Sequence, residues 1–347
     1  HCAGTIGGRT YGVAKEATIH GVKVLGDDGS GSWAWFVTGI DWVVAHGERP
    51  AIISASLGGR GTSASVSHAI KTATEAGITV VVAAGNDEDD ACEYMPAGVP
   101  EAVTVGATNR SDARAGYSNF GSCVDIFAPG SEIVSAGIAG EASNATMSGT
   151  SMATPHVAGA AALVLGAGGT ASTTASEQLA GAGGACKQLL QQISTKGALS
   201  DCQGSPNSLL YTGEGFVEPP TEPGAAPGWR PAAVPIYLAE GSTAAEEGRP
   251  RSWIVKLPGH WGTDAVREYC RGAAGRDACV LHGDPSRRGL AFAVLRLPLR
   301  ALKELLDARP GPEYAEEDSR VQAVPEIDPR EEELSEEPRT ERERVRA

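Results

Sequence analysis

The sequence has no long hydrophobic run: no apolar stretch in its 347 residues approaches the roughly 18 residues that a membrane-spanning helix requires. It is also poor in basic residues, because 29 lysines and arginines face 43 aspartates and glutamates, a net charge of −14. A protein that binds nucleic acid needs lysines and arginines to replace the counterions of the phosphates. We therefore expect neither a membrane nor a nucleic acid among its partners.

Cysteine is present in a modest number, seven in all, and no two cysteines have the Cys-x-x-Cys spacing typical of a zinc site. This favours disulfides and an oxidising compartment over free thiols. An odd number leaves at least one thiol outside a disulfide, and Cys2 is our candidate. The sequence leaves the pairing of four cysteines open: Cys186, Cys202, Cys270 and Cys279.

Two features bear on secretion. The sequons Asn109-Arg-Ser111 and Asn144-Ala-Thr146 are acceptor sites for N-glycosylation. The sequence begins at His1 with neither a methionine nor a charged and then apolar leader, so we expect a secretory leader to lie outside it. We predict a secreted or extracellular protein, with the vacuole or lysosome as the alternative.

The first half of the chain alternates short β-branched runs with Ala-rich stretches. A hydrophobic fraction of 41% is sufficient for a folded core, and the length allows two domains. Alternating strands and helices predict an α/β fold, a three-layer sandwich in which helices cover both faces of a mostly parallel sheet. The predicted strands are 21–25, 52–56, 79–83 and 102–105, and the predicted helices are 33–46, 66–76, 150–165 and 186–193.

Residues 250–324 are predicted to form a second compact unit. Its elements follow the order β-α-β-β-α-β, which suggests a small ferredoxin-like α+β domain. Between the units, residues 214–249 have the composition of a Pro/Gly-rich linker. Residues 166–184 are predicted to be a loose surface segment, and residues 325–347 a disordered charged tail. The predicted elements of the second unit are strands 252–257, 279–281, 290–297 and 313–321, and helices 264–271 and 299–308.

The strongest local signal is the string Gly149-Thr-Ser-Met-Ala-Thr-Pro-His-Val-Ala-Gly159. Pro155 is tolerated only near the start of a helix, which places Ser151 at the helix entrance. There, free backbone N–H groups and the helix dipole favour a developing negative charge. Gly149 would let a peptide substrate approach the backbone closely. The alternative is an ordinary core helix of small residues with a capping serine.

This string resembles the nucleophile motif of the subtilases, the subtilisin-like serine peptidases, and is most similar to their proteinase K and aqualysin branch. The resemblance runs from His1 to about Thr212 and implies a peptidase domain over residues 1–213. Its substrates would be extended polypeptides. Further segments agree with the family in order and spacing: 11–15, 22–25, 56–59, 83–86, 117–121 and 125–130.

The resemblance implies a role for each matching residue. Ser151 would be the nucleophile that forms an acyl-enzyme. Asn86 would donate its side-chain N–H to the tetrahedral oxyanion, although a turn residue after a strand is the alternative. Two segments would flank an extended substrate by strand addition, and a third would line the pocket for the residue before the cut. They are Gly29, Ser30 and Gly31; Ser56, Leu57 and Gly58; and Ala83, Ala84 and Gly85.

The same resemblance implies one structural ion and one disulfide. The carbonyl oxygens of Pro100 and Ala102 and the carboxylate of Asp125 match a calcium site of the proteinase K branch, and oxygen ligands suit calcium. A capping or salt-bridged role for Asp125 is the alternative. The pair Cys92 and Cys123 resembles a disulfide of the aqualysin branch. No cofactor is expected for catalysis.

Two members of the catalytic triad have no counterpart in the sequence. The family needs a histidine that takes the serine's proton and an aspartate that orients the imidazole. His1-Cys-Ala-Gly-Thr5 resembles the end of the family's His-Gly-Thr-His-x-Ala-Gly-Thr stretch. We therefore expect the catalytic histidine and aspartate upstream of His1, and the chain as given to be inactive alone. Other histidines are assigned surface, core or structural positions: His20, His46, His68, His156 and His282.

Three segments of the second unit resemble the inhibitor propeptide of subtilases: 253–257, 292–295 and 311–321. In the family this domain assists folding of the peptidase and plugs its cleft. The resemblance implies a module that serves either this peptidase domain or a second one in tandem; an unrelated ferredoxin-like domain is the alternative. Three functions stay open: a serine endopeptidase, a non-catalytic peptide binder, and a subtilase inhibitor or folding module acting through residues 250–324.

Overall fold

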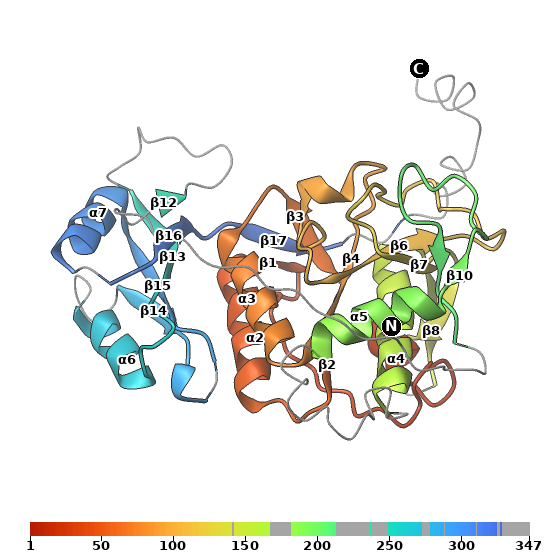
Figure 1. The fold of residues 1–347 in the computed structure, drawn as a ribbon, viewed down its shortest axis with the longest axis horizontal. Coiled ribbons are helices and arrows are strands. Elements are labelled where there is room, and N and C mark those ends of the chain that lie inside the picture. The colour runs from red at the N-terminus through yellow and green to blue at the C-terminus, as the bar shows by residue number, and fades with distance from the viewer. Residues whose placement is uncertain are drawn as a thin grey trace, which may run out of the picture.

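The computed structural model describes residues 1–140, 142–166, 182–212, 236–237, 249–272, 278–287, 289–309, 311–324 and residue 327. Most of the predicted linker 214–249, of the loose segment 166–184 and of the charged tail 325–347 lies outside the described residues. Figure 1 shows the described chain as a large unit, which holds the N-terminal half, and a smaller unit beside it. No helix in these ranges is both long and apolar enough to cross a membrane.

A six-stranded sheet forms the centre of the large unit, in the order β10-β11-β7-β6-β4-β2 (Figure 1). The five strands from β11 to β2 run parallel, and only β10 is antiparallel to its neighbour. The predicted mostly parallel sheet is therefore present. The strands are β2 (Ala51–Ala55), β4 (Ile78–Ala83), β6 (Val103–Thr108), β7 (Ile126–Pro129), β10 (Thr195–Lys196) and β11 (Ser208–Leu209).

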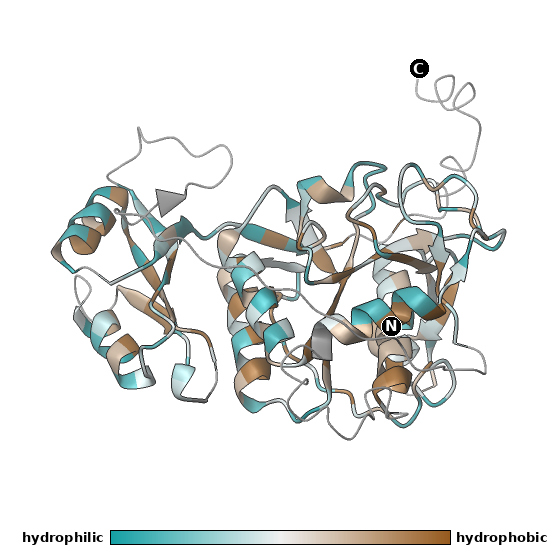
Figure 2. Ribbon diagram, in the orientation of Figure 1, coloured by the Kyte–Doolittle hydropathy of each residue, from teal (hydrophilic) through white to brown (hydrophobic). Residues whose placement is uncertain are grey.

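Helices cover both faces of this sheet. Side chains of successive strand residues point to opposite faces, and β4 divides its side chains accordingly. Val80 and Val82 pack into the cluster formed by two helices, α2 and α3, whereas Val81 packs with α4. Figure 2 shows that β4 is hydrophobic along its length, as a strand buried on both faces should be. The helices are α1 (Cys2–Gly7), α2 (Trp33–His46), α3 (Ala64–Glu75), α4 (Thr150–Gly166) and α5 (Ala182–Ile193).

The smaller unit has one five-stranded sheet in the order β12-β16-β13-β15-β14, with two helices. Its core contains the fully buried Trp253 and Leu302. Figure 2 shows alternating hydrophilic and hydrophobic stripes on α7, the pattern of a helix that buries one face. The elements are β12 (Ile236–Tyr237), β13 (Pro250–Lys256), α6 (Thr263–Gly272), β14 (Cys279–His282), β15 (Phe292–Pro298), α7 (Leu299–Ala308) and β16 (Tyr314–Glu317).

The predicted final strand, 313–321, is divided between two sheets. Its first part is β16, while β17 (Arg320–Ala323) leaves the smaller unit and enters the large one (Figure 1). There it lies between β1 (Ser30–Ser32) and β3 (Leu57–Arg60), in an antiparallel sheet of order β1-β17-β3-β5. The strand is interrupted at Asp318, whose side chain is directed at α2 instead: its Oδ1 accepts the N–H of Ala34 at 2.9 Å.

The predicted strand 21–25 is wrong. Only Leu25 forms an isolated bridge, with Gly31, and Val22 is 39% exposed. The segment 21–25 lies on the side of β1 that faces away from β17, and the Leu25 bridge is the one pairing it makes there. Composition rich in β-branched residues is therefore not sufficient to form a strand. The remaining short elements are β5 (Tyr94–Met95), the hairpin of β8 (Ile133–Ala136) and β9 (Asn144–Met147), and the 3₁₀ turns Ala91–Glu93 and Pro285–Arg287.

The two units share a hydrophobic core. Ile254 and Phe292 of the smaller sheet belong to the same buried cluster as Val37 of α2 and Ile70 of α3. Val321 of β17 joins this cluster and is 1% exposed. The smaller sheet is thus docked on α2 and α3, and the docking buries apolar surface from both units.

Candidate active site

Ser151 lies in the first turn of α4 and is 4% exposed. Its backbone carbonyl accepts hydrogen bonds from Ser56 Oγ at 3.0 Å and from Cys2 Sγ at 3.3 Å. Gly149 precedes the helix with φ +149°, a conformation that L side chains rarely adopt. Its N–H donates to the carbonyl of Gly130 at 2.9 Å. These contacts fix the helix entrance and hold Ser151 at one position.

Asn86 follows β4 and lies beside the same helix end. Its Oδ1 accepts the backbone N–H of Thr150 at 2.9 Å and the Thr150 hydroxyl at 2.8 Å. These two bonds orient the side-chain amide, with its NH₂ group on the side away from Thr150. The structure therefore places the Asn86 amide next to the residue that precedes Ser151, and its role as an oxyanion donor stays a prediction.

The residues predicted to flank an extended substrate lie on both sides of β17. Gly31 pairs with Val321, and Leu57 pairs with Ala323. The N–H of Ala323 donates to the carbonyl of Gly29 at 2.9 Å. Segments 29–31 and 56–58 lie on opposite sides of β17, and we call the position between them the groove. Figure 1 shows β17 between β1 and β3, so the chain's own residues 320–323 occupy the position predicted for an extended peptide.

The filled groove leads directly to Ser151. Its Oγ donates a hydrogen bond to the carbonyl oxygen of Val324 at 3.0 Å. The N–H of Val324 donates to the carbonyl of Ser56 at 3.2 Å, and beyond it the N–H of Ile327 donates to the carbonyl of Ser148 at 3.0 Å. Val324 and Ile327 are thus bonded to residues on both sides of Ser151, and the Val324 carbonyl lies next to Ser151 Oγ.

The three residues predicted to line the specificity pocket lie where β4 ends, beside Asn86. Ala83 and Ala84 are buried. Gly85 has φ +105°, and a Cβ there would lie 2.3 Å from Asn119 Nδ2. That nitrogen donates to the carbonyl of Ala84 at 2.9 Å, so Asn119 fixes the segment from behind. Only glycine fits at this position.

No histidine is placed to act as the base of Ser151. All seven lie in the described part of the chain, and none bonds to Ser151 Oγ there. His156, on the same helix, bonds through Nδ1 to the carbonyl of Met152 at 2.8 Å. Burial lowers the pKa of His156 below its ordinary value, so a neutral, structural imidazole is favoured. His1 Nε2 donates to the carbonyl of Ile133 at 3.0 Å.

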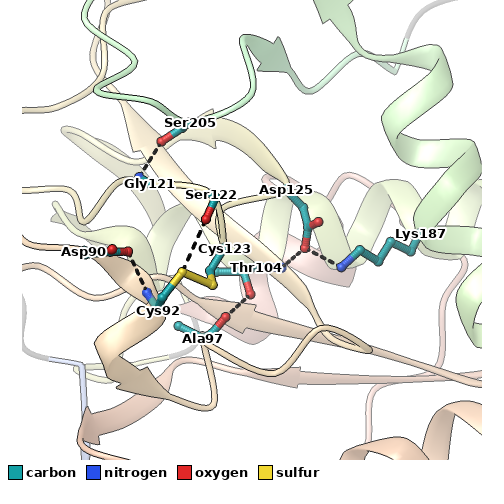
Figure 3. Close-up of a disulfide and its surroundings, with 10 residues drawn as sticks. All are labelled: Asp90, Cys92, Ala97, Thr104, Gly121, Ser122, Cys123, Asp125, Lys187 and Ser205. Atoms are coloured by element: carbon teal, nitrogen blue, oxygen red, sulfur yellow. Dashed lines mark hydrogen bonds and ion pairs between the residues drawn. A yellow bond between two sulfur atoms is a disulfide. The ribbon is translucent and has the colours of Figure 1, made fainter.

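The three predicted calcium ligands lie together, and Lys187 of α5 reaches all of them. Its Nζ is 2.8 Å from the Pro100 carbonyl oxygen, 2.6 Å from that of Ala102 and 2.8 Å from Asp125 Oδ2. Figure 3 shows Lys187 directed at the Asp125 carboxylate. The pKa of Asp125 is raised because burial outweighs the stabilising lysine. Calcium binding stays a prediction, and Lys187 is a partner that the sequence analysis did not name.

Two disulfides are present. Cys92 and Cys123 are joined with a Cα–Cα distance of 5.3 Å, next to Asp90 and Ser122 (Figure 3). In the smaller unit, Cys270 pairs with Cys279, a pairing that the sequence had left open. Both agree with the expected oxidising compartment. Three cysteines lie outside disulfides: Cys2, as expected, and also Cys186 and Cys202.

Acidic residues that the sequence analysis missed hold the two units together. Glu316 Oε2 accepts the N–H of Ser65, in the first turn of α3, at 2.7 Å. Asp318 caps α2 in the same way. Burial raises the pKa of Asp318 and of Asp41, whose carboxylate accepts the N–H groups of Asp284 and Leu290 from the smaller unit. Carboxylates are favoured at helix N-termini. The sequence around Glu316 and Asp318 does not indicate which helix each carboxylate caps, because both helices lie far away along the chain.

His68 of α3 faces the smaller unit across the same interface. A small cavity there is lined by His68, Ser65, Lys256 and Tyr314 together with apolar residues. Burial, and then the positive charges of Lys256 and Lys71, lower the pKa of His68 to about 4. The docked arrangement therefore holds this imidazole neutral.

Comparison with protein families gives one match, to the family described as the subtilase family (peptidase S8), over residues 1–205. Among curated proteins, the chain is 50% identical over 212 residues to an extracellular serine proteinase of Thermus sp. (strain Rt41A). That alignment covers 61% of this chain and 49% of the relative. It is 47% identical over 212 residues to alkaline serine exoprotease A of Vibrio alginolyticus, covering 61% of this chain and 37% of that protein.

Among solved structures, the chain is similar to a cold-adapted subtilisin-like serine proteinase. The TM-score is 0.54 and the sequence identity 44%, over 61% of this chain and 72% of that one. The chain thus spans about half or less of the length of these two curated relatives. The matched region ends before the smaller unit begins.

Proposed function

Since this chain belongs to the subtilase family, we propose that its residues 1–213 carry the nucleophile and the substrate groove of a secreted serine endopeptidase. Ser151 would attack the scissile carbonyl and form an acyl-enzyme. Asn86 would donate its amide N–H to the oxyanion, in a position fixed by Thr150. The substrate would be an extended polypeptide.

One contact carries this proposal: Ser151 Oγ donates a hydrogen bond to the carbonyl of Val324, the residue that follows β17. The strand that precedes Val324 is paired on both sides, as β-augmentation of a substrate would be. Backbone pairing would supply affinity, and the buried apolar position that Val321 occupies would supply selectivity. The nucleophile then meets a carbonyl whose position is set by the groove.

Hydrolysis also requires a base and a group that orients it. In the family's mechanism a histidine takes the proton of the serine and returns it to the leaving amine, while an aspartate holds the imidazole. All seven histidines of the sequence lie in the described part of the chain, and none of them is hydrogen-bonded to Ser151 Oγ there. We propose that the active protein carries this pair outside the sequence given, and that the chain as given does not turn over substrate.

The decisive experiment uses the longer protein that carries the histidine and the aspartate. Hydrolysis of a peptide substrate should be abolished by Ser151→Ala and unaffected by Ser122→Ala, a matched change at an exposed serine. Undiminished turnover in Ser151→Ala would end the assignment. A longer protein that binds extended peptides without cutting them would instead be the non-catalytic peptide binder.

We also propose that residues 250–324 inhibit this groove in cis. The unit would belong to the ferredoxin-like class, which the connection β13-α6-β14-β15-α7-β16 and the strand order β16-β13-β15-β14 support. The supporting observation is that β17 fills the groove as far as Ser151. The same contacts would let the unit act as a template during folding of the peptidase domain. Service to a second, tandem module is the alternative.

Secretion is proposed on separate grounds. One relative is named an extracellular proteinase, and the two disulfides suit an oxidising compartment. The vacuole or lysosome would satisfy the same chemistry. Detection of the mature protein in the culture medium, and not in the cell pellet, would decide between the two.

A further inference from the structure

Lys187 occupies the centre of the site at which the family resemblance predicts calcium. Its ammonium group is within 2.8 Å of three oxygens, the carbonyls of Pro100 and Ala102 and Oδ2 of Asp125. These are the same three atoms that were predicted to hold the metal. The side chains of Lys187 and Asp125 are only 18% and 13% exposed, so the pair is largely shielded from water.

The number of acceptors matches the ammonium group. A lysine carries three N–H donors and no acceptor, and each of the three oxygens accepts one of them. Calcium takes six to eight oxygen ligands at about 2.3–2.6 Å, of which this site supplies three. A calcium ion here would also lie against the positive charge of Lys187. The residues fit calcium only if the lysine leaves.

Further hydrogen bonds fix the position of the Asp125 carboxylate relative to Lys187. Asp125 Oδ2 also accepts the N–H of Thr104 at 2.8 Å, and its Oδ1 accepts Gln191 Nε2 at 3.0 Å. Gln191 follows Lys187 by one helical turn, so both side chains leave the same face of α5. Two side chains of α5 therefore bind one carboxylate, and they attach the helix to the segment between β6 and β7.

We propose that Lys187 is the built-in cation of this site and replaces calcium. Pro100, Ala102 and Asp125 would then serve as acceptors for an ammonium group rather than as metal ligands. The domain would hold the segment around Asp125 in place at any calcium concentration. The family's metal-dependent brace would have become an ion pair that is part of the chain.

The test is thermal unfolding of the full chain in excess chelator and in millimolar calcium. The wild-type melting temperature should be the same in both. Lys187→Ala should lose about 5 °C or more in chelator, because it leaves a buried carboxylate without its cation. Calcium should then restore most of this loss in a saturable manner. The combined variant Lys187→Ala with Asp125→Asn should show no calcium response.

A matched control is Lys15→Ala, which removes an exposed lysine with a single bond to the Thr10 carbonyl. It should leave the melting temperature and its calcium response unchanged. Calcium that stabilises the wild type, with the effect lost in Asp125→Asn, would overturn the proposal without any lysine variant. Equal calcium stabilisation of the wild type and Asp125→Asn would place the metal elsewhere and leave Lys187 in its site.

Discussion

Ser151 Oγ donates a hydrogen bond to the carbonyl oxygen of Val324 at 3.0 Å, although the two residues lie 173 positions apart in the sequence. The proposed nucleophile is thus in contact with a segment near the other end of the chain. The contact depends on two docking surfaces: strand pairing along β17, and the apolar interface between the smaller sheet and α2 and α3.

Val321 should be the anchor of the strand that fills the groove. It is 1% exposed, whereas Gln322 on the same strand points to solvent. Val321→Asp would bury an unpaired charge, so it should release the strand and increase binding of a fluorescent extended peptide by tenfold or more. Gln322→Ala should leave peptide binding unchanged. Equal binding by both variants would show that β17 does not obstruct the groove.

Acid should weaken docking of the smaller unit through His68. Its pKa is about 4 when docked and should return towards its ordinary value of about 6.5 when released. The docked state binds fewer protons, so it loses stability as the pH falls from about 6.5 towards 4. We expect groove opening, measured by the same peptide, to rise roughly tenfold between pH 7 and pH 5.

The control for this acid response is His68→Gln. A glutamine does not titrate in this range, so the rise in peptide binding between pH 7 and pH 5 should be largely absent. A pH response as steep as that of the wild type would exclude His68 as its source. Asp41 and Asp318 would act in the opposite direction, because burial raises the pKa of each carboxyl and acid then favours the docked state.

Asp318 should stabilise the turn between the two sheets. It accepts the Ala34 N–H at the start of α2, and the loss of such a cap costs about 1 kcal/mol. Asp318→Ala should therefore lower the melting temperature by about 2–4 °C. Asp318→Asn keeps an acceptor oxygen and should lose less. If both variants have the same melting temperature as the wild type, the cap contributes nothing to docking.

Asn86 should affect turnover and stability through opposite ends of its amide. In the longer, active protein, Asn86→Asp removes the N–H donor and should lower kcat by about 10²–10³-fold. It keeps an oxygen for Thr150, so its melting temperature should stay near that of the wild type. Asn86→Ala should lose both activity and stability. An Asn86→Asp enzyme with unchanged kcat would exclude the oxyanion role.

Local pattern was sufficient for most of the elements. The helix over 33–46 was predicted with its observed bounds, and the structure shows Ser32 capping its first turn. The segment 21–25 failed because a β-branched run forms a strand only where a partner pairs with it. Local pattern does not show where β17 goes either, because its partners β1 and β3 lie near the other end of the chain. The propeptide resemblance implied a peptidase cleft but left open whether it belongs to this domain or to a second one.

Some residues of the candidate site could likewise be predicted from the sequence, and others could not. Ser151 and Asn86 lie in short motifs whose spacing carries the resemblance, so the sequence placed them together. Lys187 belongs to no motif: its role depends on α5 lying beside the Asp125 segment, a tertiary contact without a local signal. Asp318 likewise serves a helix that lies 284 residues away in sequence.

The short connection between β16 and β17 has a consequence for competition. Only Asp318 and Ser319 separate the two strands, so a docked smaller unit holds its strand at the mouth of the groove. A tether this short gives an effective concentration in the millimolar range. A free peptide would have to compete with the tethered strand β17, whose local concentration does not fall when the protein is diluted. Cleavage at Asp318 or Ser319 would remove this tether, so β17 could then dissociate like an ordinary peptide ligand.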